Sequence, residues 1–360
     1  MLRAPVLQRP LRKHVVDRGY LTTLRCSFPM LTSKDGASEA TPREPSMETV
    51  TRTQRIEADR FVTDYIARNR PVIITDSMRT WTGCGKWNPG YFRDRFGDAL
   101  TLIYDNLFTL RDVRPLREYI DRYFGKQEEF EHVYARCYAK FKAVDFHWFD
   151  AVFDALAQEW SHPYFLPTTS YVMPLCRPPE TVLANRNVFP YKGLFISPRG
   201  ARTRLHRDPY GTDAILCQFF GTKRLALYHP CNDGKVRKGT QFVDPKKPDR
   251  RAFPDFTGVQ PVYEDELQPG EVLFIPSGWF HDVVSVTDSI SITWNFVHAA
   301  HRGAFLREIA DPVNKFDRDM LDFFFSGGAG RKVSVEEMTR LALSVEDFNP
   351  SESRPLHAAI

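Results

Sequence analysis

The chain has 360 residues, of which 42% are hydrophobic and 13% aromatic. A chain of this composition can bury a substantial core, which excludes a protein that is disordered throughout. Its 49 Lys and Arg residues against 45 Asp and Glu residues give a net charge of only +4. This mild excess does not indicate nucleic-acid binding, which usually leaves clustered basic stripes and a pI above about 9. The length fits one large domain or two small ones.

Two further features of the sequence indicate the compartment in which the protein works. No apolar run approaches the ~18 residues of a membrane span, so we expect no membrane partner. The six Cys are scattered without a C-x-x-C pair, which argues against a zinc ribbon or a disulfide framework and suits a reducing compartment. These features favour a cytoplasmic or nuclear protein.

Residues 1–47 are predicted to form a disordered leader and linker. Residues 1–34 carry seven basic residues against the single acid Asp17, and a stretch rich in Ser, Pro, Gly and Glu follows. Such a segment has little apolar surface to bury. Its Arg-rich, acid-poor start is compatible with a transit peptide, which would make the protein mitochondrial. A disordered tail or an overlong gene start explains the same composition.

Residues 48–160 predict a mostly helical layer with pieces of strand. Apolar residues recur at helical spacing in three stretches: 54–69, 116–124 and 148–160. A further helix is expected between Asn88-Pro89, which supply an N-cap and a first-turn proline, and Gly97. Residues 72–75, VIIT, read as a short buried strand.

Residues 161–300 predict a sandwich or barrel of many short strands. Apolar runs such as AILCQFF, KRLALYH and EVLFIP alternate there with turn residues. Between 290 and 296 the pattern alternates, with large apolar residues on one face and Ser291, Thr293 and Asn295 on the other. This strand indicates a barrel lined by a polar cavity and covered by the helical layer. The alternative is a solvated outer face for the polar residues.

Residues 301–360 predict C-terminal helices. Ser334 and Glu337 have the S-x-x-E spacing of a capping box, which opens a helix. The run Phe323–Phe325 is expected to be core or a subunit contact. In the second case the C-terminal helices would form a homodimer.

The segment between Pro230 and Pro254 is a long loop with seven basic residues: Lys235, Arg237, Lys238, Lys246, Lys247, Arg250 and Arg251. Loops of this length are usually functional or disordered. The basic residues form either a solvated charge run or a lid and docking patch for an acidic partner.

One His-x-Asp pair, His206 and Asp208, lies in the predicted barrel. Residues i and i+2 of a strand project from the same face, so an imidazole and a carboxylate would lie side by side. Two His and one carboxylate on one face form a type of iron site that leaves the other positions of the metal open. His281, which follows a strand and a Pro-Ser-Gly turn, is the candidate third ligand.

The chain resembles the Jumonji C (JmjC) oxygenases of the cupin superfamily, in particular small cupin-like hydroxylases, over roughly residues 54–330. The resemblance is carried by T-x-x-H-x-D at 203–208, by G-T-K-R with Lys223, by P-G-E-x-L-F-I-P-x-G-W-x-H ending at His281, and by I-T-W-N-F at 292–296. It implies an α+β fold with a mainly β core, a double-stranded β-helix (jelly-roll) barrel covered by N-terminal and C-terminal helices.

The resemblance also implies an enzyme that uses iron(II), 2-oxoglutarate and O₂. His206, Asp208 and His281 would be its catalytic metal ligands. The residues expected to bind 2-oxoglutarate are Thr203, Lys223, Thr293, Asn295 and, in the segment VYARCY, Tyr134. Lys223 suits the far carboxylate because a buried ammonium needs an anionic partner. Some relatives have an Asn on the strand before the lysine, where this chain has Leu216.

Several functions remain open at this point. The leading prediction is a dioxygenase that hydroxylates a protein side chain and converts 2-oxoglutarate to succinate. The alternatives are a JmjC lysine demethylase, a tRNA-base hydroxylase acting on RNA, and a non-catalytic cupin-like binding module. Arg204 and Arg207 flank His206 and would repel a cationic methyl-lysine if either pointed inward. Strand alternation turns Arg207 away, so this argument for hydroxylation depends mainly on Arg204.

Overall fold

The computed structural model describes residues 48–138, 148–175, 192–311, 318–326 and 331–352. The predicted leader and linker, residues 1–47, lie outside these ranges, and so does the proposed transit peptide. In the part of the chain that is described, no helix is both long and apolar enough to cross a membrane. Four cysteines there are free thiols: Cys84, Cys137, Cys217 and Cys231.

A ten-stranded mixed sheet forms one layer of the barrel. Strand β6 (Tyr171–Met173) pairs only with β16. The other strands follow the order β1 (Arg52–Thr53), β2 (Val72–Ile74), β14 (Val272–Ile275), β9 (Asp213–Phe220), β16 (Ser289–His298), β7 (Lys192–Ser197), β5 (Tyr134–Tyr138), β3 (Leu100–Tyr104) and β4 (Leu110–Pro115). Strand β16 is central because it pairs with both β7 and β9.

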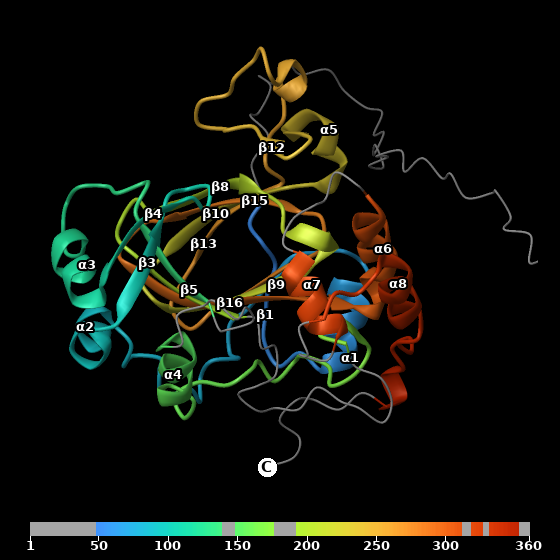
Figure 1. Ribbon diagram of the computed structural model, residues 1–360, viewed down its shortest axis with the longest axis horizontal. Coiled ribbons are helices and arrows are strands. Elements are labelled where there is room, and N and C mark those ends of the chain that lie inside the picture. Colours follow the sequence, from blue (N-terminus) through green and yellow to red (C-terminus); the bar gives the residue numbers. More distant parts are fainter. Residues whose placement is uncertain (1–47, 139–147, 176–191, 312–317, 327–330, 353–360) are drawn as a thin grey trace, which may run out of the picture. The chain divides into compact units, whose positions relative to one another are not determined.

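A four-stranded antiparallel sheet forms the second layer. Its order is β13 (Tyr263–Leu267), β10 (Lys223–Tyr228), β15 (Phe280–Ser285) and β8 (Arg202–His206). Figure 1 shows β8, β10 and β15 above β5, β16 and β9. Side chains of both sheets share one apolar cluster, which includes Leu225 and Leu227 of β10 and Leu273 of β14. Two sheets packed face to face in this way form the predicted double-stranded β-helix.

The alternation predicted for β16 is confirmed. Ile290, Ile292, Trp294 and Phe296 are at most 1% exposed and belong to the largest apolar cluster. On the other face Ser291 is 1% exposed, and Asn295 lies close enough to hydrogen-bond Asp208. This polar face therefore points toward the candidate site and is not a solvated outer face.

The N-terminal segment differs from the predicted helical layer. Its helices are α1 (Ala58–Phe61), α2 (Pro89–Phe96), α3 (Leu116–Tyr123) and α4 (Trp148–Ala155), and a π-helical turn at Val62–Ile66 extends α1. However, β1 to β5 also lie in this segment and join the large sheet. Helical residues still outnumber strand residues in this segment, as expected, but β2 is the one of these strands that was predicted. The others join a sheet whose central strands come from much later in the chain. For example, β5 pairs with β7.

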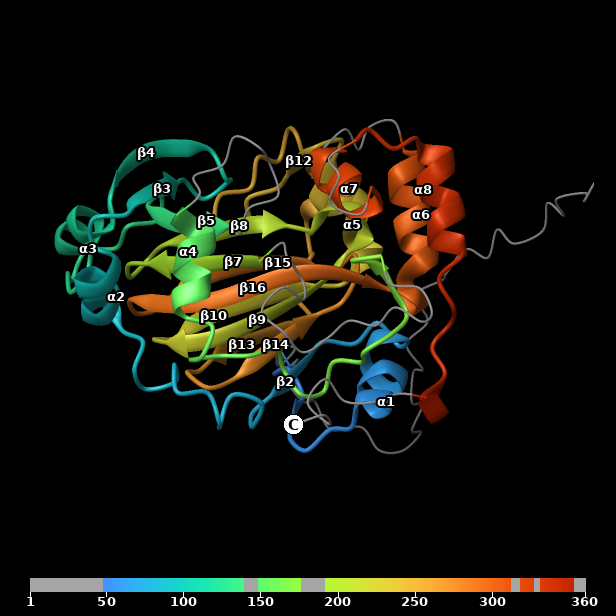
Figure 2. The same cartoon turned by 60° about the horizontal axis from the view of Figure 1, so that its bottom comes forward.

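Local signals for α2 are confirmed. The Asn88 side chain accepts a 2.9 Å hydrogen bond from the Tyr91 amide, Pro89 occupies the first turn, and Gly97 is the C-cap. Figure 2 shows α2, α3 and α4 beside the strands of the large sheet. Buried residues of α2, α3 and α4, such as Phe92, Ile120 and Val152, pack in the same cluster as the apolar face of β16.

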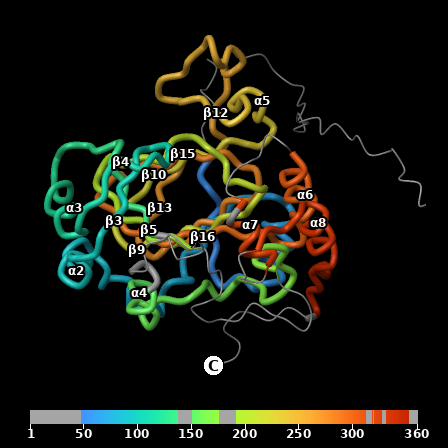
Figure 3. Tube along the Cα trace, viewed as in Figure 1, coloured from blue at the N-terminus to red at the C-terminus, as the bar shows by residue number. Residues whose placement is uncertain are grey.

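The C-terminal helices are α6 (Arg302–Ala310), α7 (Arg318–Phe325) and α8 (Val335–Leu343). Ser334 caps α8 by accepting a 3.1 Å hydrogen bond from the Glu337 amide, as predicted. Phe324 and Phe325 are buried in a second apolar cluster, so they belong to the core. The tube in Figure 3 shows α6 and α8 side by side, at the end of the barrel away from α2 and α3. A homodimer through these helices stays a prediction.

The basic loop is an ordered insert between β10 and β13. It contains α5 (Asp233–Val236), the hairpin of β11 (Arg237–Lys238) and β12 (Gln241–Phe242), and a 3₁₀ turn at Pro254–Phe256. Its apolar side chains form a small core with Leu205 of β8 and Phe280 of β15. The insert is thus packed onto the two strands that carry the candidate ligands, which favours a docking surface over a mobile lid.

Candidate metal centre

Strand pairing brings the three predicted ligands together. Strands β8 and β15 are antiparallel neighbours, and His206 is the partner of His281 in the register. Asp208 follows two residues after the end of β8. The ligand atoms of His206, Asp208 and His281 all lie within 4.8 Å of one another. Residues 75 positions apart in sequence therefore form a single cluster.

Hydrogen bonds to carbonyl groups fix both imidazoles. The Nδ1 atom of His206 lies 2.8 Å from the carbonyl oxygen of Arg204, and Nδ1 of His281 lies 3.3 Å from that of Trp279. A carbonyl only accepts, so each Nδ1 carries the proton and each Nε2 is left with a lone pair. In metal sites, hydrogen bonds of this kind hold the imidazole rings in the orientation that the metal needs.

The charge states also suit a metal. Burial, and secondly the neighbouring His281, lower the pKa of His206 well below its ordinary value, so this imidazole is neutral. Burial raises the pKa of Asp208, although His281 and a hydrogen bond from Asn295 act in the opposite direction. Two imidazoles and one carboxylate are a donor set that fits a divalent iron ion.

A buried lysine lies on β10, the strand that pairs with β15. Lys223 is 1% exposed, and its ammonium group hydrogen-bonds the Tyr134 hydroxyl. Burial raises the pKa of Tyr134, but the positive charges of Lys223 and Arg136 outweigh it, and the net shift is downward. Arg224 turns to the opposite face, as strand alternation predicts, and pairs with Glu266 at 3.0 Å.

A glycine turn fixes the start of the strand that carries Lys223. Gly221 has a φ of 69°, and a Cβ there would lie 1.8 Å from the carbonyl oxygen of Asp288. Only glycine fits this close approach and this backbone conformation. The first residue of β10 is therefore held at a defined depth in the barrel.

The other predicted pocket residues lie on β8 and β16, one strand from each sheet. Thr203 of β8 is 8% exposed and accepts a 2.9 Å hydrogen bond from Arg136. Thr293 donates to the carbonyl of Ile215 at 2.7 Å, and Asn295 donates to Thr212 at 3.3 Å. The structure thus groups Tyr134, Thr203 and Lys223, while Thr293 and Asn295 lie along β16.

The departure at Leu216 falls opposite one of these residues. In the ladder between β9 and β16, Leu216 is the partner of Thr293. Its side chain packs against the apolar cluster between the two sheets. Where some family members have the amide of an Asn, this chain has the apolar side chain of Leu216. The polar surface near Thr293 therefore comes from β16 and not from β9.

The sequence prediction missed Arg136, which is fully buried on β5. It lies two residues after Tyr134, so strand alternation puts both side chains on the same face. That signal was available as soon as Tyr134 was chosen, because the segment VYARCY alternates. An arginine at such a position is uncommon inside a core and marks a site with a specific task.

The surroundings of Arg204 differ from the expectation that its charge would repel a cationic substrate. Arg204 does not present a free charge, because it lies 3.4 Å from a carboxylate oxygen of Asp244. Arg207 turns away and pairs with Glu308 at 2.8 Å. Repulsion of a cationic substrate by Arg204 is therefore weaker than predicted, since its charge is balanced by the insert.

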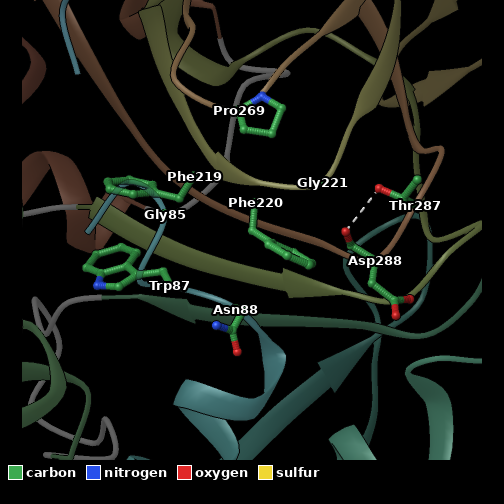
Figure 4. Close-up of a pocket in the computed structure, with 9 residues that line it drawn as sticks. All are labelled: Gly85, Trp87, Asn88, Phe219, Phe220, Gly221, Pro269, Thr287 and Asp288. Atoms are coloured by element: carbon green, nitrogen blue, oxygen red, sulfur yellow. Dashed lines mark hydrogen bonds between the residues drawn. The ribbon is translucent and has the colours of Figure 1, made fainter. Parts of the chain in front are cut away.

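A separate groove of about 590 Å³ lies at the other end of β9 (Figure 4). Its lining is mainly apolar and includes Trp87, Phe219 and Phe220, with Thr287 and Asp288 at one side. None of the predicted site residues lines it. The groove is thus distinct from the His206, Asp208 and His281 cluster.

The fold is that of a cupin, and within it His206, Asp208 and His281 form a cluster of two imidazoles and one carboxylate that could hold a metal ion. The family model for the cupin-like domain matches residues 58–302, and the chain therefore belongs to the cupin-like domain family. This match covers the barrel, the N-terminal helices and all the candidate ligands.

Relatives of known name are similar over most of the chain. The chicken "2-oxoglutarate and iron-dependent oxygenase JMJD4" is 22% identical over 78% of this chain and 67% of its own length. The Arabidopsis thaliana "Arginine-specific demethylase JMJ22" is 24% identical over 72% of this chain. The "Lysine-specific demethylase JMJ21" of the same plant is 25% identical over 71% of it. The match spans only 48% and 26% of the two plant proteins.

Proposed function

We propose that this protein is an iron(II)- and 2-oxoglutarate-dependent oxygenase that hydroxylates a protein side chain. The observation that carries the proposal is the convergence of His206, Asp208 and His281 within 4.8 Å in a barrel that also buries Lys223. A non-catalytic cupin has no need to keep three ligand atoms together and to bury a cation as well. The combination therefore supports an enzyme over a binding module.

Different residues of the barrel would bind the iron and the 2-oxoglutarate. His206, Asp208 and His281 would hold the iron. When bound, iron(II) with 2-oxoglutarate and O₂ supplies an oxidation in which 2-oxoglutarate loses CO₂ and becomes succinate, one oxygen atom entering succinate and the other a C–H bond of the target. Lys223 would pair with the far carboxylate of 2-oxoglutarate, and Tyr134 would hydrogen-bond the same group.

The polar groups of three further strand positions complete the proposed pocket. Thr203 lies on β8, the strand that also carries His206, and Thr293 and Asn295 lie on the inward face of β16. We assign Thr203 to a hydrogen bond with 2-oxoglutarate. The Thr293 hydroxyl donates to the Ile215 carbonyl, so Thr293 would bind 2-oxoglutarate only by exchanging that bond for one to the ligand. Asn295 would also hold Asp208, with which it interacts.

The first test is metal and cosubstrate turnover by the purified protein. Anaerobic titration with Fe(II) should give binding of one ion per chain, and adding 2-oxoglutarate, ascorbate and air should give slow succinate formation without a target. Absence of divalent-metal binding by the wild-type protein would refute the enzyme proposal.

Hydroxylation is favoured over demethylation by the charge near the iron site. The buried guanidinium of Arg136 lies 4.0 Å from the ring of Phe108, and that ring contacts the edge of His206 at 5.5 Å. A cation at this place disfavours a methylammonium or methylguanidinium group, because like charges repel strongly at low dielectric. A neutral or acidic target is therefore the better match. The names of the relatives leave both outcomes open, since they include an oxygenase and demethylases.

Product mass separates these outcomes. Candidate peptides are incubated with the enzyme, Fe(II), 2-oxoglutarate and ascorbate, and a gain of one oxygen atom is expected. Loss of a methylene group with release of formaldehyde would identify a demethylase. An oxygen gained on a tRNA base and not on protein would move the proposal to RNA.

A further inference from the structure

We infer that Arg136 is a positioning residue for 2-oxoglutarate, acting by holding the Thr203 hydroxyl as a donor to the far carboxylate beside Lys223. The inference rests on the proposed function, because it assigns a task within the same pocket. Arg136 comes from β5, Thr203 from β8 and Lys223 from β10, so three strands contribute to one arrangement.

The guanidinium of Arg136 is held in a single orientation. It is fully buried, and its Nη1 atom donates to the carbonyl of Asp105 at 2.9 Å. Its carbon Cζ lies 4.0 Å from the ring centroid of Phe108 and 4.3 Å from that of Tyr134. Planar stacking of this kind stabilises a buried guanidinium and limits its movement. The second terminal nitrogen, Nη2, is thereby directed at Thr203.

Arginine has no acceptor, so its hydrogen bond to Thr203 decides where the threonine proton goes. Nη2 of Arg136 donates to Oγ1 of Thr203 at 2.9 Å. The hydroxyl oxygen is the acceptor in this pair, and its own hydrogen must point to another acceptor. Arg136 thus converts Thr203 into a hydrogen-bond donor with a fixed direction.

The same logic applies to Tyr134. The ammonium of Lys223 also lacks an acceptor, so the Tyr134 oxygen accepts from it and the phenolic proton points elsewhere. Tyr134 lies between the two cations, because Arg136 covers its ring while Lys223 contacts its hydroxyl. The pocket therefore presents an ammonium and two hydroxyl protons. A carboxylate, which only accepts, is the group that matches such a set of donors.

The inference is tested by binding to the Mn(II)-substituted protein, with two 2-oxo acids as probes. 2-Oxoglutarate has the far carboxylate, whereas 2-oxopentanoate has the same metal-binding end without it. Arg136→Met should weaken 2-oxoglutarate binding by about tenfold or more, since a hydrogen bond to a charged group is lost. Binding of 2-oxopentanoate should stay within about twofold, because only the far end is affected.

A double-mutant cycle shows whether Arg136 acts through Thr203. Thr203→Val alone should weaken 2-oxoglutarate binding to a similar extent, and Arg136→Met added to it should cost no more than about a further twofold. Arg136→Gln keeps an amide donor for Thr203 and should bind 2-oxoglutarate within about threefold of the wild type. Mn(II) affinity reports on the fold in every variant. If Arg136→Met no longer binds Mn(II), the 2-oxoglutarate affinity of Arg136→Gln tests the inference instead.

Three results would overturn the inference. These are unchanged 2-oxoglutarate affinity in Arg136→Met, fully additive losses in the double variant, and equal losses in the Gln and Met variants. A parallel loss of 2-oxopentanoate binding in variants that still bind Mn(II) would also contradict it. Failure of the proposed function looks different, because then the wild-type protein itself would not bind Mn(II) or 2-oxoglutarate.

Discussion

At the scale of single residues, the candidate site is a set of ligands and donors whose roles follow from protonation. His206 and His281 each give their Nδ1 proton to a backbone carbonyl, which leaves Nε2 for a metal. Lys223 and Arg136 can only donate, so Tyr134 and Thr203 act as acceptors toward them and as donors toward a ligand.

Removing one ligand should abolish metal binding. Asp208→Ala leaves only the two imidazoles, which hold a divalent ion far more weakly than a set with a carboxylate. We expect no iron binding at micromolar Fe(II) and no succinate formation without a target. Isothermal titration under anaerobic conditions measures the first and mass spectrometry the second. A variant that binds iron as the wild type does would remove Asp208 from the ligand set.

Removing the buried ammonium should affect 2-oxoglutarate and not the metal. Lys223→Ala leaves a carboxylate in the barrel without its cation, at a cost of ~3–5 kcal/mol in 2-oxoglutarate binding. Arg224→Ala is the matched control, since Arg224 lies on the solvent face of the same strand. The KM for 2-oxoglutarate measures both. A rise of less than about threefold in Lys223→Ala, below 1 kcal/mol, would point to another cation.

At the scale of elements, the sequence allowed prediction of those parts whose signals are local. The N-cap of α2 at Asn88, the cap of α8 at Ser334 and the alternation of β16 depend on neighbours in sequence, and all three are confirmed. The ligands were predicted for the same reason, because each lies in a short motif. Strand β5 was missed because its partners β3 and β7 lie far away in the chain. Strands β3 and β4 pair with each other locally, and their hairpin was not recognised.

The position of Arg136 shows what local sequence patterns could not predict. Alternation from Tyr134 gives its direction, but its contact with Thr203 joins residues 67 positions apart. Likewise, the neutralisation of Arg204 by Asp244 depends on an insert that no local pattern places beside β8. Pair contacts between distant segments decide the chemistry of this site, and single motifs do not encode them.

One carboxylate attaches α2 to the segment after α4. Glu159 is 7% exposed. Burial opposes its ionisation, but hydrogen bonds from Lys86, Trp87, Tyr91 and Arg95 outweigh it and lower the pKa of Glu159 from 4.5 to about 2. Because the folded-state pKa is the lower one, the stabilisation is complete above pH 4.5 and is lost as the pH falls toward about 2.

Glu159→Gln should therefore destabilise the fold at neutral pH by about 2–3 kcal/mol, less than the full shift implies because Lys86 and Arg95 are partly exposed. The free energy of unfolding from urea titration, repeated between neutral and acid pH, measures this. The difference between variant and wild type should shrink as the pH falls below 4.5. Asp121→Asn, at the exposed pair with Arg93, is the control and should cause no measurable change. A pH-independent difference would show that the charge of Glu159 is not responsible.

At the scale of the whole described structure, the basic insert and the metal centre form one assembly. Arg202 of β8 is 1% exposed and binds Asp282, which follows His281, at 2.6 Å. The same guanidinium binds Asp244 of the insert at 2.8 Å. A single buried cation thus connects both ligand strands to the insert. This connection keeps the exposed basic residues of the insert at a fixed place near the mouth of the barrel.

That arrangement predicts capture of an acidic protein target by the insert. Its exposed basic residues are Lys235, Lys238, Lys246, Lys247, Arg250 and Arg251. Their attraction for an acidic peptide should weaken with salt, because the screening length falls from about 30 Å at 0.01 M to about 8 Å at 0.15 M ionic strength. The KM for an acidic peptide that the enzyme hydroxylates should therefore rise over this range of ionic strength, while kcat stays constant.

Charge reversal on the insert tests the same point without a change of salt. Lys247→Glu with Arg251→Glu should raise the KM for the peptide by about tenfold or more at low salt, through loss of long-range steering and attraction. Lys126→Glu is the control, because Lys126 is also exposed but lies outside the insert, directly after α3. Succinate formation without peptide should be the same in all three proteins, since none of these residues lies in the barrel. A KM that changes neither with salt nor with charge reversal would show that the target binds elsewhere. The basic residues would then be a solvated surface without a part in substrate binding.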